Sequence, residues 1–330
     1  MDLNKLVEVK MKILMLSYNF FGYEKEIIKE LELKYNVKHI SLELSLLEVI
    51  YLYFIQIIFN SIKRKEIYSK IINKKLKIKN NDFKNVDILF VLGFNEFNQN
   101  NFNFLNNNFS IKEKYLYLWD DVTRVKELSL YKKYFNKIYS FDKKDCQENN
   151  FIYRPTFYSK RLEKLEKNKI KYEISFVGAY SIKRNFYLKN IIDKNFKNKF
   201  IYLYMDFKIY LKNYIFNSEY KFKNINFFKI SKEKYNLIMS QSEIVIDLLQ
   251  FNQTGVTQRT LDALYLNKKI ITNNEYIKNY DFYNSNNILI INENTTEKEI
   301  RNFKNKKYIE IKKEIIEYYS LERWIKDIFK

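Results

Sequence analysis

The segment Ile244–Asn274, IVIDLLQFNQTGVTQRTLDALYLNKKIITNN, contains the most informative pattern in the chain. Its apolar start predicts a buried strand that ends near Asp247, and the polar residues around Gly255 predict a loop. A helix is predicted over Val256–Leu266, and a second strand over Lys269–Thr272. This order of strand, loop, helix and strand is typical of a parallel α/β sheet.

The loop and the start of this helix carry groups that suit an anionic ligand. Backbone N–H groups at a helix N-terminus point toward such a ligand, and Gly255 permits its close approach. Thr254 and Thr257 add hydroxyls, and Arg259 adds a cation for a diphosphate. Asp262, about one turn after Arg259, is a candidate acceptor for ribose or sugar hydroxyls. The alternative is a plain connection with a capping threonine and an Asp–Arg helix pair, and these residues alone leave both readings open.

A second glycine-ended strand lies about 70 residues earlier in the chain. The predicted strand Tyr172–Gly178 is followed by a polar turn with Ser181, Lys183 and Arg184. Gly178 leaves room for a ligand across the turn, and the basic pair are candidates to contact a diphosphate. The alternative is a tight turn that carries exposed charges.

Short apolar runs alternate with helical patterns along the whole chain, whose 330 residues suit two domains. We therefore expect an α/β protein of two Rossmann-like domains facing a cleft, residues 1–155 and 156–330. The last helix is expected either in the second domain or packed back on the first. The remaining predicted strands are Lys12–Ser17, Val37–Leu42, Val86–Gly93, Tyr115–Asp120, Lys137–Asp142, the short Phe151–Tyr153, Phe200–Met205, Ile225–Phe228 and Ile288–Ile291.

The two glycine motifs resemble the donor site of group 1 glycosyltransferases of the GT-B type, particularly the CgeB-like branch. In that branch a glycine-bearing loop leads to an arginine, an acidic residue and an alanine, here Gly255, Arg259, Asp262 and Ala263. The family more often has glutamate where Asp262 stands, and glycine where Asn267 stands. These departures concern the contact to the donor hydroxyls.

The resemblance covers Tyr172–Asn274 and implies a GT-B fold with a nucleotide-sugar held mainly by the second domain. It also implies transfer of a sugar to a bacterial surface polysaccharide, a lipooligosaccharide or another glycan or lipid-linked acceptor. The nucleotide-sugar is then a substrate, and neither a cofactor nor an obligatory metal is expected.

The first domain is expected to bind the acceptor. Asp120 ends a predicted strand, where sites in open α/β sheets gather, and is the candidate base that deprotonates an acceptor hydroxyl. Asp121 is predicted to cap the next helix, and Glu96 and Asp142 are weaker candidates for the base. Residues expected to line the cleft are Asn19 and Gly22.

The net charge of +20, from 59 basic and 39 acidic residues, allows a partner with negative charge. The lysines are scattered, so we expect most of them on solvated faces, with a modest attraction to an anionic membrane surface rather than nucleic-acid binding. A basic nucleic-acid-binding protein remains an alternative. So do another double-Rossmann enzyme, such as an epimerase or a pyruvyl transferase, and a non-catalytic partner of a glycosyltransferase.

Cysteine and histidine each occur once, as Cys146 and His39. This excludes an internal disulfide, a zinc cluster and a site that needs two histidines. The chain suits a reducing, cytoplasmic compartment, and its polar N-terminus does not resemble a signal peptide. The apolar run Val49–Phe59 is too short to span a bilayer. We predict a buried helix there, with a helix lying in a membrane interface as the alternative.

Overall fold

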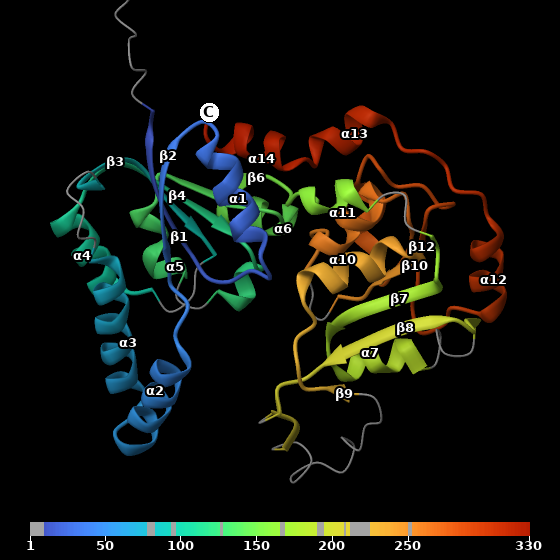
Figure 1. Cartoon of the computed structure of the whole chain (residues 1–330), viewed down its shortest axis with the longest axis horizontal. Helices are drawn as coiled ribbons and strands as arrows, with labels where there is room; N and C mark the ends of the chain where they lie inside the picture. The colour runs from blue at the N-terminus through green and yellow to red at the C-terminus, as the bar shows by residue number, and fades with distance from the viewer. Residues whose placement is uncertain are drawn as a thin grey trace, which may run out of the picture. The chain divides into compact units, whose positions relative to one another are not determined.

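In the computed structural model, the described residues are 10–330 except for 78–82, 94–96, 126–127, 166–168, 190–194, 208, 212–224 and 250–252. Their contacts divide the chain into two compact units. Unit 1 contains Met1–Arg154 together with Asp327–Lys330, and unit 2 contains Pro155–Lys326. Each unit is built around a six-stranded parallel sheet. Figure 1 shows the strands of each unit with helices beside them.

The sheet of unit 1 has the strand order β2-β1-β3-β4-β5-β6. Its strands are the short apolar runs predicted from the sequence, because a parallel sheet covered on both faces needs apolar side chains on both. The strands are β1 Lys12–Ser17, β2 Asn36–Ser41, β3 Asn85–Leu92, β4 Ser110–Leu118, β5 Lys137–Ser140 and β6 Ile152–Tyr153. The helices are α1 Tyr23–Glu32, α2 Leu46–Ile58, α3 Ser61–Leu76, α4 Gln99–Asn108, α5 Leu128–Tyr131 and α6 Lys143–Asn149.

Alternate strand residues face the two sides of this sheet. On one face, Leu14 and Leu89 belong to a buried cluster with residues of α3 and α4. On the other face, the Phe329 ring from the C-terminus contacts the rings of Phe90 and Tyr115, with centroids 5.1 and 6.3 Å apart. The last residues of the chain therefore complete the core of unit 1.

Helix α2 corrects the prediction of a buried helix over Val49–Phe59. Among its residues only Leu52 is buried, whereas Phe54 and Ile57 are 54% and 61% exposed. The helix begins with a Ser45 capping box and packs against α3. An apolar sequence shows what a helix can bury, but not whether the fold supplies something to cover it. Among the described residues, no helix is long and apolar enough to cross a membrane.

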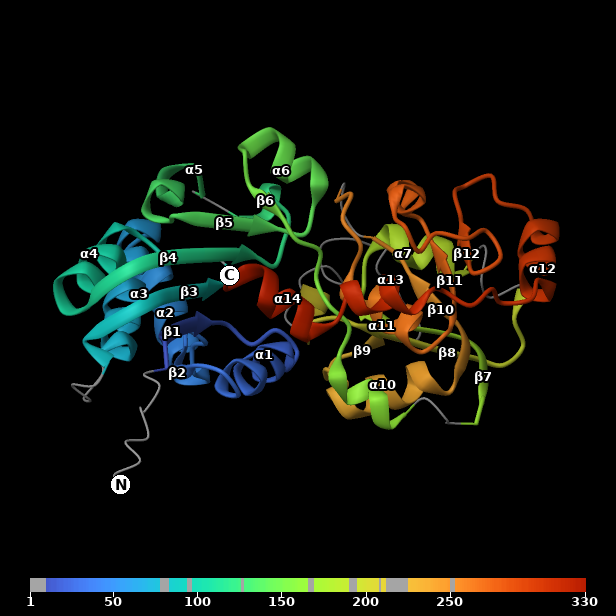
Figure 2. The same cartoon turned by 90° about the horizontal axis from the view of Figure 1, so that it is seen from above.

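The sheet of unit 2 has the order β12-β11-β10-β7-β8-β9, again all parallel. Figures 1 and 2 show α10 and α7 on opposite sides of this sheet. The strands are β7 Tyr172–Ala179, β8 Lys199–Tyr204, β9 Ile225–Asn226, β10 Ser242–Asp247, β11 Lys269–Thr272 and β12 Ile288–Ile290. The helices are α7 Ile182–Tyr187, α10 Lys232–Ser240, α11 Gln258–Tyr265, α12 Glu297–Asn305, α13 Lys313–Tyr318 and α14 Leu321–Ile328.

In each sheet there is one pair of neighbouring strands at which the order of strand addition reverses. In unit 2 the chain adds β8 and β9 on one side of β7 and then β10, β11 and β12 on the other. The switch point of this sheet is therefore the β7–β10 pair, and that of unit 1 is the β1–β3 pair. In open α/β sheets, ligands bind outside the carboxyl ends of the strands at such points.

Candidate functional site

The carboxyl end of β10 carries a buried acid. Asp247 is 1% exposed and accepts hydrogen bonds from the hydroxyls of Thr257 and Thr260, at 2.7 and 2.6 Å. The guanidinium of Arg259 donates to it at 2.7 Å, so the charge is paired. Thr257 also caps α11, where its Oγ1 accepts from the backbone N–H of Thr260 at 3.4 Å. The start of α11 is thereby held against the end of β10.

Arg259 spans the switch point of this sheet. Beyond its bond to Asp247 in β10, its Nη2 donates to the carbonyl of Val177 in β7 at 2.7 Å. Its guanidinium lies over the Phe176 ring, 5.2 Å from the centroid. The prediction placed this residue beside a diphosphate, and the structure places it at the edge where such a ligand would bind, with two of its N–H groups used internally.

A second arginine lies at the same edge. Ser181 caps α7 by accepting from the backbone N–H of Arg184 at 3.2 Å. The Arg184 side chain donates to the carbonyls of Leu248 and Ala179, at 2.8 and 2.9 Å, and its guanidinium lies 5.7 Å from the Phe176 centroid. Lys183, also predicted at this site, is exposed. The two arginines therefore flank one aromatic ring at the end of β7.

Gly178 lies close to two side chains of unit 2. A Cβ at this position would lie 2.8 Å from Cζ of Phe176 and 3.3 Å from Nη2 of Arg259. The glycine therefore makes room for the arginine and the ring, and the predicted room for a ligand stays a prediction.

The loop before α11 is held by side chains from a later segment. Thr254 and Gly255 are buried, and their carbonyls accept from the side-chain amide of Asn274 at 3.3 and 3.4 Å. The backbone N–H of Val256 donates to the Tyr280 hydroxyl at 3.3 Å. The earlier loop residues Gln250 and Asn252 lie outside the described residues.

Asp262 requires a correction. Its side chain is 0% exposed, and one carboxylate oxygen accepts from the backbone N–H of Ser159 at 2.7 Å. The other lies 3.5 Å from the ammonium of Lys232. Because both oxygens face the interior, the predicted contact with a sugar hydroxyl is wrong for this arrangement. Asp262 instead fixes the segment that enters unit 2.

At the carboxyl edge of unit 1, Asp120 follows the end of β4 after one residue, Trp119. Its carboxylate pairs with Arg124 at 2.5 Å and is 44% exposed. The surrounding protein still removes enough water to raise the pKa of Asp120; Arg124 opposes this rise and Asp121 adds to it. A carboxylate with a raised pKa and an open face is suited to accept a proton.

Further acids at this edge have structural partners. Asp121 caps the turn Val122–Arg124, as predicted, and Asp142 caps α6. Asp145 accepts from the backbone N–H of Val122 at 2.8 Å, and burial raises its pKa to about 6. Glu96 lies outside the described residues. Among the residues that are described, no group of His, Cys, Asp or Glu side chains is arranged to hold a metal ion.

The turn after β1 is filled by the protein itself. One carboxylate oxygen of Glu24 accepts from the backbone N–H groups of Phe20 and Gly22 at 3.0 and 3.1 Å. Gly22 has a φ of 88°, which suits glycine. The Phe20 ring lies against Gly93, at the end of β3, and its centroid is 4.9 Å from that of Trp119. The switch point of unit 1 is thus occupied by a carboxylate and an aromatic ring.

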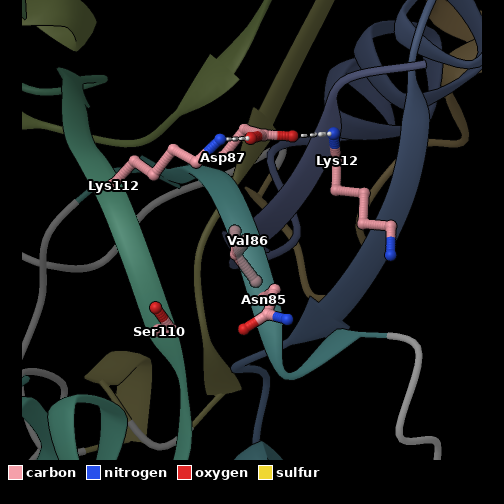
Figure 3. A pocket seen from close by; sticks show the side chains of 6 residues that line it. All are labelled: Lys12, Asn85, Val86, Asp87, Ser110 and Lys112. Atoms are coloured by element: carbon pink, nitrogen blue, oxygen red, sulfur yellow. Dashed lines mark hydrogen bonds and ion pairs between the residues drawn. The ribbon is translucent and has the colours of Figure 1, made fainter. Parts of the chain in front are cut away.

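A cavity of about 390 Å³ lies at the opposite edge of this sheet, by the amino ends of β1, β3 and β4 (Figure 3). Asp87 in its wall accepts from the backbone N–H of Lys12 at 2.8 Å and pairs with the Lys112 ammonium at 2.6 Å. Because the acid is paired and the edge is the wrong one for ligands of parallel sheets, we do not assign this cavity to the site.

Two residues of the switch points were missed by sequence analysis. The sequence pattern marks Asp247 only as the end of a strand, and it gives Glu24 no role. An acid as the last residue of an otherwise apolar strand was the available signal for Asp247, since a buried charge needs partners. The role of Glu24 had no such signal, because helices commonly begin with acidic residues.

No protein-family model matches the sequence, and no curated protein matches it. Solved structures do match the fold. A UDP-GlcNAc 2-epimerase from Methanocaldococcus jannaschii is 13% identical with a TM-score of 0.55, over 97% of this chain and 99% of that one. An alpha-glucosyltransferase in complex with UDP and a 13-mer DNA is 13% identical with a TM-score of 0.60, over 97% and 100%.

A sucrose-phosphate synthase from Thermosynechococcus elongatus is 8% identical with a TM-score of 0.57, over 97% of this chain and 98% of that one. At such identities the likeness concerns the fold alone. Two six-stranded parallel sheets with flanking helices, matched over nearly the whole length of these enzymes, show that this chain has the GT-B fold of two Rossmann-like domains.

Proposed function

We propose that this protein is a glycosyltransferase that moves a sugar from a nucleotide-sugar to a glycan acceptor, and that it belongs near the CgeB-like branch. The observation that carries the proposal is Arg259 bridging Asp247 and the Val177 carbonyl at the switch point of unit 2. Arg184 lies at the same edge. Two guanidiniums at one carboxyl edge provide the planar cationic groups that bind a diphosphate.

The corresponding edge of unit 1 is less suited to hold the nucleotide of the donor. The N–H groups after β1, where the first turn of a Rossmann fold often holds phosphate, already bind the Glu24 carboxylate. A nucleotide diphosphate would have to displace that carboxylate. We therefore assign the donor to unit 2 and the acceptor to unit 1.

In the proposed reaction, Asp120 accepts the proton of an acceptor hydroxyl. The acceptor oxygen forms a bond to the anomeric carbon of the donor sugar as the bond from that carbon to the phosphate oxygen breaks. The nucleoside diphosphate leaves with an added negative charge, which the guanidiniums of Arg184 and Arg259 stabilise. Lys183 and the loop at Thr254, Gly255 and Thr257 are proposed to contact the donor, and Asp262 to act only by holding the unit together.

A second candidate is an enzyme that remodels the sugar of its nucleotide-sugar without transferring it. The similarity to an epimerase, with a TM-score of 0.55, is close to the similarity to the glucosyltransferase, at 0.60. The two reactions differ in their products. Transfer releases a nucleoside diphosphate, whereas epimerisation leaves the sugar attached to the nucleotide.

The first test is calorimetric titration with UDP, GDP, ADP and CMP, followed by NMR of each matching nucleotide-sugar. We expect one nucleotide to bind and Arg184→Gln to weaken it about tenfold, because a charged contact to phosphate contributes about 1.5 kcal/mol. Arg301→Gln is the matched control, since Arg301 is 68% exposed on α12. Binding of oligonucleotides without any nucleotide response would contradict the proposal. Detection of an epimerised nucleotide-sugar, without release of a nucleoside diphosphate, would favour the second candidate over a glycosyltransferase.

A further inference from the structure

Helix α2 presents an exposed apolar face. Placed on a helical period of 3.6 residues, its exposed apolar side chains fall on one continuous arc. The buried Leu52 and the half-buried Ile55 and Glu48 lie on the opposite side. The exposed apolar side chains of α2, of the turn after it and of the first turn of α3 are Leu46, Leu47, Val49, Ile50, Tyr51, Tyr53, Phe54, Ile57, Ile58, Phe59 and Ile62.

These eleven side chains carry no charge, and a surface of this size is rare on a protein that remains free in water. Helix α2 contributes little to the core of unit 1. Its side toward the protein contributes Leu52 to the cluster that contains Tyr68 and Ile72 of α3. The outer face therefore has another use.

Cations border the apolar face. Residues 45–77, which include α2 and α3, contain seven Lys and Arg and two Glu, a net charge of +5. Lys63 and Arg64 lie in the first turn of α3, and Lys65 follows them. The two acids are paired within the hairpin: Glu66 lies 2.8 Å from the Lys63 ammonium, and Glu48 lies 3.1 Å from that of Lys75.

The dimensions of α2 limit how it can meet a bilayer. Its 13 residues extend about 20 Å at 1.5 Å per residue, whereas a hydrocarbon core is about 30 Å thick. A helix of this length with an apolar face and adjacent cations can lie along the interface, with its rings and aliphatic chains among the acyl chains and its cations at the headgroups.

We propose that α2 and the first turn of α3 form a membrane-docking surface for anionic lipid bilayers. The apolar face supplies insertion, and the border of Lys63, Arg64 and Lys65 supplies selectivity for negative headgroups. The proposal adopts the alternative to the buried helix, namely a helix that lies in a membrane interface. Membrane docking does not depend on the proposed sugar transfer, so vesicle binding and nucleotide binding can fail independently.

Flotation with vesicles tests the surface. We expect the full chain to float with vesicles of equal phosphatidylcholine and phosphatidylglycerol, and several-fold less with phosphatidylcholine alone. The triple variant Ile50→Asn, Phe54→Asn and Ile57→Asn should lose at least tenfold in affinity for the anionic vesicles. Because these side chains are already exposed, the variant should keep the circular dichroism and melting temperature of the parent.

The control carries the same substitutions at exposed apolar residues elsewhere, Leu33→Asn, Leu130→Asn and Phe228→Asn, which are 65%, 60% and 83% exposed. This control should float like the parent. An equal loss in both variants, or no loss in the α2 variant, would overturn the proposal. So would a parent that does not float and sediments as a dimer while the α2 variant sediments as a monomer, because a second copy would then cover the face.

Discussion

The two sheets of this protein have closely related strand orders but opposite chemistry at their switch points. Between β7 and β10, Arg259 joins the strands and Arg184 lies alongside, so cations face the carboxyl edge. Between β1 and β3, the Glu24 carboxylate and the Phe20 ring fill the corresponding position. A common topology therefore provides two places for ligands, and the side chains there decide that only one of them suits a diphosphate.

The remaining acids of unit 1 extend this contrast. Asp120 keeps an open face beside Trp119, while Asp121, Asp142 and Asp145 serve the local backbone. An acidic edge suits proton transfer from an acceptor, and a cationic edge suits a leaving diphosphate. Substitutions at each edge can test whether the two edges have these separate roles.

The largest expected effect is at Asp120. Asp120→Asn removes the proposed base and should lower the transfer rate about 10²- to 10⁴-fold while nucleotide affinity is unchanged. The measurement is single-turnover transfer beside calorimetry. Asp142→Asn is a poor control because it removes the cap of α6. The control is Glu148→Gln, since Glu148 forms an exposed ion pair with Lys144. A base at Asp120 is refuted if the rate stays within a few fold of the parent.

Arg259→Met should be the most destabilising single change at the cationic edge. It leaves Asp247 buried without its cation, and breaking a buried pair costs about 3–5 kcal/mol. Urea unfolding would measure the loss. Arg301→Met, at a pair whose side chains are 68% and 57% exposed, should change the free energy of unfolding by less than about 0.5 kcal/mol. Equal losses of unfolding free energy in the two variants would mean that the Arg259–Asp247 pair stabilises the fold no more than an exposed ion pair does.

Asp145→Asn should stabilise unit 1 at neutral pH. The pKa of Asp145 is raised to about 6, so between pH 4 and 6 the folded state holds a proton that the unfolded chain has lost. Stability from this group therefore falls as the pH rises through that window. Removing the charge should add about 2 kcal/mol at pH 7 and flatten the profile, as chemical denaturation at several pH values would show.

Asp87→Asn should change stability at neutral pH in the opposite direction to Asp145→Asn. The Lys112 ammonium lowers the pKa of Asp87, so its ionised form contributes stability that is lost as the pH falls through its lowered pKa. The variant should be slightly less stable than the parent at pH 7. A gain at Asp87 or a loss at Asp145 would contradict the electrostatic contrast between these two acids.

A steric effect is expected at Gly178. Gly178→Ala places a methyl group 2.8 Å from the Phe176 ring and should cost about 1–2 kcal/mol by overpacking. Combining it with Phe176→Leu should recover part of that loss, which a thermal melt of the double variant would detect. If Gly178→Ala instead weakened only nucleotide binding and left the melt unchanged, the interpretation of this glycine as room for a ligand would be supported.

Much of the candidate site was predictable because its signals are local. The cap at Thr257, the cap at Asp121 and the glycine near the end of β7 follow from short-range patterns. Asp262 was misjudged because its partner, Ser159, lies 103 positions earlier in the chain. Helical spacing places Arg259 and Asp262 about a turn apart, but it does not say which of them faces the core.

The sequence by itself determined the α/β alternation, the strand positions and the apolar and charged composition of α2, because each depends on neighbouring residues. Only the tertiary structure decided which strands meet at the switch points and whether α2 is covered. Strand order and burial arise from contacts between segments far apart in the chain. The same apolar run can therefore fill a core or face outward, depending on what the fold places beside it.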